Sequence, residues 1–227
     1  MVRSQSEEPE LSGGLAQLGE RLLCKQNVAG SIPVTSTINN NMTLDKFAEI
    51  DVELSDNTLT HLNELAVRLP YNERSILTHY TNNLTLSLSS EIDKFVSEFE
   101  CTMSIVRIMP ACDLIWHKDV HPQRTCVINI PLKNYTNQVT YITDKDIQES
   151  FGQRNSYPHE NVNKVIHKPY QIPYNYKKSY LINVSEKYHC VFNLTDEYRY
   201  LLSIQTGKLT YQQGVDYFTN LNLIANR

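Results

Sequence analysis

Apolar residues recur at helical spacing in two segments of the first half of the chain. They fall three and four residues apart in Asp56–Leu69 and again in Ser90–Glu100. Pro70 directly follows the first segment and would end a helix there. A third segment, Thr210–Ile224, is expected to form a C-terminal helix. The pattern predicts amphipathic helices, which need an apolar surface to cover.

From Cys101 onward the chain consists of short runs rich in β-branched and aromatic residues, separated by turn-forming groups. The predicted strands are Met103–Met109, Thr125–Leu132, Gln138–Ile142, Val162–His167, Ser179–Val184, Tyr188–Leu194 and Tyr198–Gln205. Many short strands, with helices mainly at one end, predict two packed antiparallel sheets backed by helices. We therefore expect a mainly β domain with a helical part at 42–100, a β core at 101–206 and a helix at 210–224.

The first forty-one residues differ from the rest in composition. They hold four of the seven glycines and show no hydrophobic periodicity, which is typical of a disordered tail. Back-translation of Gly14–Glu20 and Gly30–Pro33 resembles the D-arm and T-arm of a tRNA gene. We interpret residues 12–36 as an in-frame translation of such a gene, with Met42 as the true start. The segment 1–41 is thus expected to be a disordered or spurious extension, and 42–227 a single domain.

Composition excludes several classes of protein. With 227 residues and a net charge of −4, the chain has no basic stripe of the kind that binds nucleic acid. No apolar run approaches the roughly 20 residues that a membrane span requires. The five cysteines are scattered without a CxxC pair, so neither a zinc ribbon nor a disulfide framework is indicated. We expect a soluble, cytoplasmic protein of a reducing compartment, and the sequence does not indicate its oligomeric state.

The segment Ile115–Asp119 contains the first group of residues that could bind a metal ion or take part in catalysis. In an extended strand, side chains two residues apart point the same way, so His117 and Asp119 face a common point. An imidazole beside a carboxylate supplies two of the three ligands of a facial metal triad. The same pair also occurs as a surface contact or a helix cap. His121 is a further candidate ligand, although Pro122 after it favours a turn.

The second group lies near the C-terminus. His189 sits in an apolar strand, where an unsatisfied imidazole would be costly. It is therefore either hydrogen-bonded in the core or bound to a ligand. Arg199 lies within the next apolar strand and requires an anionic partner. That partner is either the carboxylate of a ligand or a protein acid such as Glu186 or Glu197.

Taken together, the order of these residues resembles that of the iron(II)- and 2-oxoglutarate-dependent oxygenases. His117-x-Asp119 comes first, His189 follows about seventy residues later, and Arg199 comes ten residues beyond it. The resemblance implies a double-stranded β-helix, a jelly roll like that of the cupins. It also implies that His117, Asp119 and His189 bind Fe(II), and that Arg199 pairs with the far carboxylate of 2-oxoglutarate.

Two further segments, Arg107–Pro110 and Asn129–Leu132, resemble the aspartyl/asparaginyl/proline hydroxylase branch of this family. That branch places an arginine, and a histidine two residues later, on the strand after His-x-Asp. Here Asn129 stands in for the histidine and Arg124, slightly out of register, for the arginine. With Ser104 on the preceding strand, they are expected to help bind the co-substrate.

The resemblance implies a dioxygenase that uses O2 and 2-oxoglutarate to hydroxylate an amino-acid side chain, with release of succinate and CO2. An Asp or Asn residue, a proline or a similar group would be the target, in a small amino acid or in a peptide or protein. Two alternatives stay open. One is a metal-binding cupin that needs no 2-oxoglutarate, against which Arg199 argues. The other is a non-catalytic jelly-roll binding module, in which His117 and Asp119 would be incidental.

Overall fold

The computed structural model describes residues 44–71, 77–80, 86–133, 138–143, 147–149, 159–165, 169–193 and 195–224. These residues belong to one unit that spans Asn39–Arg227. The predicted N-terminal extension 1–41 and the tRNA-like segment 12–36 lie outside the described residues.

The described residues form strands with three interspersed helices. The helices are α2 (Asp56–Arg68), α3 (Ser90–Glu98) and α4 (Tyr211–Asn220). The strands are β1 (Phe47–Glu53), β2 (Leu77–Tyr80), β3 (Thr102–Ile108), β4 (Cys112–Asp119), β5 (Cys126–Pro131), β6 (Gln138–Thr143), β7 (Ile147–Glu149), β8 (His159–Val165), β9 (Tyr170–Ile172), β10 (Lys178–Ile182), β11 (Tyr188–Asn193) and β12 (Arg199–Thr206). Each of the seven predicted strands begins and ends within a few residues of its prediction, and β4, β7 and β9 are additional.

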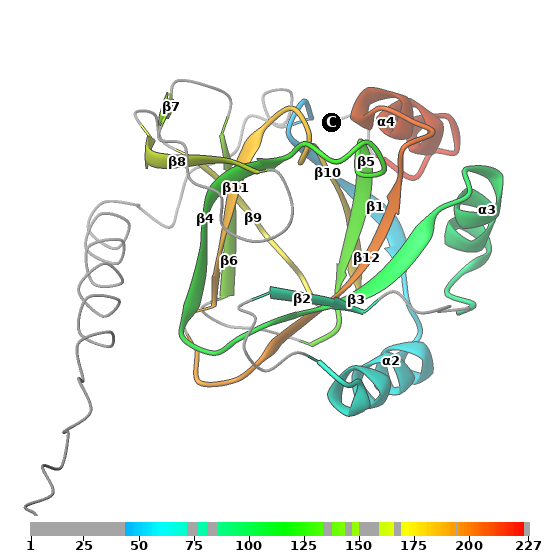
Figure 1. The fold of residues 1–227 in the computed structure, drawn as a ribbon. Coiled ribbons are helices and arrows are strands. Elements are labelled where there is room, and N and C mark those ends of the chain that lie inside the picture. The colour runs from blue at the N-terminus through cyan, green and yellow to red at the C-terminus, as the bar shows by residue number, and fades with distance from the viewer. Residues whose placement is uncertain are drawn as a thin grey trace, which may run out of the picture. The chain divides into compact units, whose positions relative to one another are not determined.

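The strands form two antiparallel sheets. Sheet A has the order β1-β10-β5-β12-β3-β2, and sheet B has the order β7-β8-β4-β11-β6-β9. From β3 to β6, and again from β10 to β12, each successive strand along the chain belongs to the opposite sheet. Figure 1 shows β4, β11 and β6 facing β5 and β12, with all three helices beside sheet A. This alternation is that of a double-stranded β-helix, so the predicted jelly-roll fold is confirmed.

The largest apolar cluster lies between sheet A and the helices. Residues from alternate positions of β12 and β5 pack there against Leu59 and Leu62 of α2, Phe95 of α3 and Phe218 of α4. Each of these four side chains is nearly or fully buried. Burial of this apolar area is the dominant favourable contribution to folding. The helices thus close the outer face of sheet A and leave its inner face turned toward sheet B.

Each helix begins at a polar cap. Ser55 accepts a hydrogen bond from the backbone N–H of Thr58 at the start of α2, and Ser89 caps α3 in the same way. Thr210 and Gln213 form a reciprocal capping box at the start of α4. These side chains satisfy backbone donors that a helix start leaves without partners.

The prediction of a helical segment at 42–100 is wrong in one respect. It contains α2 and α3, but also β1 and β2, which form the two edges of sheet A. The signal for β1 was present, because Ala48, Ile50 and Val52 are buried and alternate with acidic residues. Strand β1 pairs with β10, more than a hundred residues later in the chain.

None of the helices in the described part has the length and apolar character needed to cross a membrane. The four cysteines in the same ranges, Cys101, Cys112, Cys126 and Cys190, form no disulfide. Burial raises the pKa of Cys101 and of Cys126 to about 12, so both thiols stay protonated at neutral pH.

Candidate metal and co-substrate site

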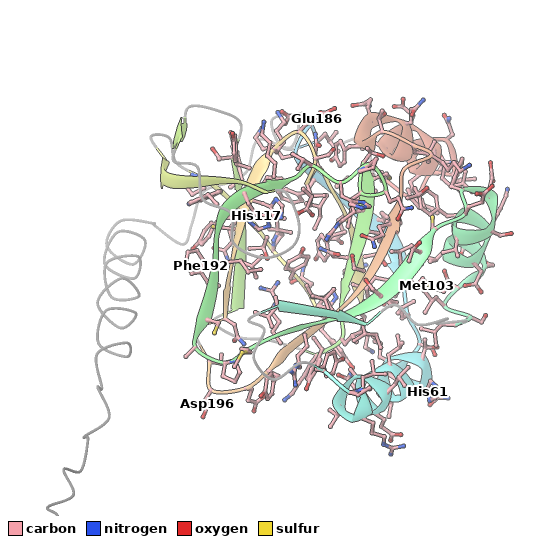
Figure 2. All side chains as sticks on the ribbon, viewed as in Figure 1. His61, Met103, His117, Glu186, Phe192 and Asp196 are labelled. Atoms are coloured by element: carbon pink, nitrogen blue, oxygen red, sulfur yellow. The ribbon has the colours of Figure 1, made fainter. Side chains whose placement is uncertain are left out.

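Three side chains predicted as metal ligands converge between the two sheets. His117 and Asp119 lie on β4, and His189 lies opposite His117 on the neighbouring strand β11. One ligand atom from each residue lies within 4.8 Å of the others. All three side chains are buried, and the ring centres of the two histidines are 4.2 Å apart. Figure 2 labels His117 on this part of sheet B.

The local strand geometry explains how they meet. Residues directly opposite each other on antiparallel strands share a face, which brings His117 and His189 to the same side. Asp119 joins them because it lies two residues from His117 along β4. Between His117 and Leu114 the pairing with β11 is irregular, with three steps on β4 against two on β11. Such irregularities change the direction of side chains. Here Leu114 packs against a small apolar cluster formed by Val106, Ile108, Val191 and Leu201.

The environment of His189 keeps its imidazole neutral. Burial lowers the pKa of His189 to about 3, and the nearby charges of His117 and Arg124 act in the same direction. The carboxylate of Asp119 opposes them but does not outweigh burial. A neutral imidazole retains a lone pair for a metal ion, so at neutral pH the residue is ready to act as a ligand.

Arg124, expected to contact the co-substrate, lies against Asp119. Its Nη2 atom forms an ion pair with Oδ2 of Asp119 at 3.0 Å. The other carboxylate oxygen, Oδ1, lies 3.7 Å from Nε2 of His117. Arg124 therefore stands next to the proposed ligands, on the turn between β4 and β5, and contacts one of them directly.

Arg199 forms the centre of a second polar group. It begins β12 in sheet A, and its side chain is 1% exposed. Its Nη2 atom donates a hydrogen bond to Oγ1 of Thr140 on β6, in the opposite sheet, at 3.0 Å. The guanidinium thus crosses the space between the sheets. The two protein acids considered as partners for it pair elsewhere, Glu186 with Asn183 and Glu197 with Lys133.

Tyr174 and Asn129 complete this group. The guanidinium of Arg199 lies over the ring of Tyr174, 5.1 Å from its centre. The amide of Asn129 on β5 donates a hydrogen bond to the Tyr174 hydroxyl at 3.3 Å. Burial raises the pKa of Tyr174, which Arg199 opposes, so the phenol keeps its proton. A cation and a phenolic O–H together suit a ligand carboxylate.

Polar side chains line the part of the inner face of sheet A that lies between the candidate metal ligands and Arg199. One row across the sheet contains Asn129, Ser203 and Ser104 on three adjacent strands. Both serines are buried, and the Oγ atom of Ser203 makes no hydrogen bond to the described part of the chain. Gln205, the next inward position on β12, likewise has a buried Oε1 atom without a hydrogen bond there. Buried polar atoms of this kind are costly unless a ligand or water meets them.

On sheet B, the candidate metal ligands and the group around Arg199 are one row of paired residues apart. His189 pairs with Ile142 on β6, and Val191 pairs with Thr140. Two residues along a strand correspond to about 7 Å. A short dicarboxylate that pairs with Arg199 at one end can therefore reach the three converging ligand atoms with its other end.

The structure brings together most of the predicted site residues. His117, Asp119 and His189 converge, while Arg199 and Asn129 share a second group of contacts. The rival ligand His121 lies apart from the triad, with its Nδ1 atom accepting a hydrogen bond from the N–H of Gln123.

Two residues that contact Arg199, Thr140 and Tyr174, are not among the predicted site residues. Thr140 resembles any strand threonine, and Tyr174 is one of several tyrosines in a proline-flanked stretch. They lie beside Arg199 only because the two sheets pack face to face.

The donor set fits a non-haem iron ion. Two imidazoles and one carboxylate on one side of an ion form the facial triad of Fe(II) oxygenases, which leaves the opposite positions open. Here the three donor atoms are mutually within 4.8 Å, buried, and next to a polar interior. The residues present therefore fit Fe(II).

Comparison with known proteins gives likenesses of structure at low sequence identity. No family model matches the chain, and no curated protein matches it. A prolyl hydroxylase from Trichoplax adhaerens, in complex with a hypoxia inducible factor peptide fragment, has a TM-score of 0.49 at 12% identity, covering 86% of this chain and 94% of that one. A Pseudomonas putida prolyl-4-hydroxylase has a TM-score of 0.46 at 8% identity, covering 73% and 97%. A Burkholderia pseudomallei oxidoreductase of the 2OG-Fe(II) oxygenase family has a TM-score of 0.43 at 12% identity, covering 79% and 94%.

Proposed function

We infer that this protein is a dioxygenase dependent on Fe(II) and 2-oxoglutarate. The observation that carries the inference is the pairing of two sites in one interior. A buried set of two imidazoles and a carboxylate lies one strand row from a buried arginine held across the sheets by Thr140. A metal-binding cupin without an organic co-substrate has no use for the second of these sites.

The three ligands have distinct contributions. His189 supplies a neutral nitrogen because burial lowers its pKa, and His117 supplies a second nitrogen from the paired strand. Asp119 supplies the negative charge that a divalent cation requires in a buried site. Three such donors would hold the ion from one side and would leave positions for the co-substrate and O2.

Arg199 and its neighbours would bind the far carboxylate of 2-oxoglutarate. The guanidinium provides a fixed positive charge and a planar pair of donors, and Thr140 holds it in place. Tyr174 retains its phenolic proton and adds a neutral donor beside it. The resulting pocket selects a carboxylate, and its distance from the metal ligands limits the length of the acid.

With iron and 2-oxoglutarate bound, the site would supply an oxidant strong enough to hydroxylate an unactivated C–H bond. The overall reaction balances: one oxygen atom of O2 enters the new hydroxyl group and the other enters succinate, while 2-oxoglutarate loses CO2. The protein's part is to place the reactants and exclude water, for which the buried interior between the sheets is suited. As the substrate we propose the side chain of an amino acid such as Asp, Asn or proline, free or within a peptide.

The test is an anaerobic titration of the full chain with Fe(II) and 2-oxoglutarate, followed by exposure to air. We expect a visible charge-transfer band in the wild type and slow release of succinate in air. His189→Ala should lose both, because two remaining ligands hold iron poorly. His61→Ala, which removes an exposed histidine of α2, should retain both. If the wild type shows neither the charge-transfer band nor the release of succinate, the proposed function is refuted.

A further inference from the structure

The two oxygen atoms of Asp119 have different surroundings. Oδ1 lies 3.7 Å from Nε2 of His117, and Oδ2 lies 3.0 Å from Nη2 of Arg124. The Asp119 side chain is 4% exposed, so the guanidinium offsets a charge that water barely solvates. One oxygen therefore lies near the imidazole of His117, while the other forms an ion pair with Arg124.

The turn that carries Arg124 is fixed by the loop after β12. A Cβ atom at Gly207 would lie 2.2 Å from the carbonyl oxygen of Pro122, so this approach requires a glycine. The Thr125 hydroxyl donates a hydrogen bond to the backbone carbonyl of Leu209 at 2.6 Å. These contacts hold the base of the Arg124 side chain at a set distance from Asp119, so the ion pair is built into the fold.

We propose that Arg124 is a positioning residue that makes Asp119 bind the metal ion through one oxygen only. The proposal rests on the proposed function, because it concerns the same metal site. A carboxylate free to turn would offer both oxygens and fill a position that a chelating co-substrate needs. The guanidinium also repels a divalent cation nearby. Arg124 thus lowers the affinity for the metal and keeps the position for the co-substrate open.

The decisive variant is Arg124→Gln, studied in the full chain. Without co-substrate, its affinity for Mn(II) should rise about tenfold, because a repulsive charge is lost and Asp119 gains a second free oxygen. The 2-oxoglutarate concentration needed for half of the Fe(II) charge-transfer band should also rise about tenfold. Metal affinity therefore increases while co-substrate affinity decreases.

Other roles for Arg124 predict different results. A general structural defect would weaken the binding of both metal and co-substrate. A contact with the co-substrate alone would leave Mn(II) affinity unchanged. The matched control is Lys118→Gln, which removes one positive charge from the residue next to Asp119 on β4. The ammonium of Lys118 lies over the ring of Tyr188. The control should leave both affinities unchanged.

An unchanged or weakened Mn(II) affinity in Arg124→Gln overturns the proposal. If that variant does not fold, Arg124→Lys decides, because it keeps the charge without the planar fork. In that variant a raised affinity for Mn(II) together with a raised 2-oxoglutarate requirement supports the proposal, because Asp119 is released although the charge stays, and an unchanged affinity for Mn(II) overturns it. If the wild type shows no charge-transfer band at all, the proposed function fails, while the Mn(II) comparison still reports on Arg124.

Discussion

The two faces of strand β12 differ sharply in what they contact. Leu202 and Ile204 point outward into the apolar cluster beneath the helices and are fully buried. Arg199, Ser203 and Gln205 point inward together with Leu201, where polar side chains of both sheets gather beside a small apolar cluster. A period of two along one strand is enough to separate these environments.

The two faces of β12 divide stability and chemistry between them. The outer face buries hydrocarbon against α2, α3 and α4, and it contributes most of the free energy of folding. The inner face carries buried charges and polar atoms that add little to stability or reduce it. Such atoms are retained where a ligand meets them. Outer substitutions should therefore change stability, and inner ones should change binding.

The neighbouring pair Ser203 and Ile204 tests this division most strongly. Ile204→Ala should lower the free energy of unfolding by about 2–5 kcal/mol, because it leaves a cavity in the outer core. Ser203→Ala should change it by less than about 1 kcal/mol, because the hydroxyl makes no hydrogen bond within the described part of the chain. Urea unfolding of both variants checks this. Equal losses would show that the two faces are not divided in this way.

Arg199→Ala should produce the next largest effect, on binding. The 2-oxoglutarate concentration required for half-maximal succinate release should rise about 100-fold, because a charge-assisted contact is lost. Mn(II) affinity should change little, since Arg199 is not one of the three residues that could hold a metal ion together. Arg68→Ala, which removes an arginine that is 77% exposed on α2, is the control. An unchanged co-substrate requirement in Arg199→Ala would contradict the assignment.

Thr140→Val should give a smaller effect of the same kind. The change keeps the shape of the side chain but removes the hydroxyl that accepts a hydrogen bond from Arg199. We expect the 2-oxoglutarate requirement to rise about three- to tenfold, corresponding to one hydrogen bond. Measurement of kcat and KM for the co-substrate should place the effect in KM. A fall in kcat alone would argue against a role in co-substrate binding.

Tyr174→Phe should produce the smallest change. The ring that lies beside Arg199 remains, and only the hydroxyl group bonded to Asn129 is lost. A two- to threefold rise in the 2-oxoglutarate requirement, about half a kcal/mol, is expected. An effect as large as that of Arg199→Ala would mean that the phenol is the main carboxylate donor.

The sequence predicts that the three candidate metal ligands lie together, because their signals are local. His117 and Asp119 share a face of any extended strand, and His189 stands out in an apolar run. The resemblance to a known family then joined them into one site, and the structure brings them together. The strands of the core are predictable for the same reason, since each depends on its own alternation and turns.

Contacts between distant segments are not predictable in this way. Thr140 and Tyr174 meet Arg199 only because two sheets pack face to face. Arg124 was assigned to the co-substrate from its position along the chain, yet the turn between β4 and β5 brings it to Asp119. Strand β1 shows the opposite case, because its alternation of buried and acidic residues is clear in the sequence although the segment 42–100 is predicted to be helical.

The most direct test of the account is a crystal structure of the full chain grown without oxygen, with Mn(II) and 2-oxoglutarate. The account predicts one ion bound by His117, Asp119 and His189, with the far carboxylate of the acid paired to Arg199. An ion bound elsewhere, or a dicarboxylate that does not reach Arg199, would contradict it.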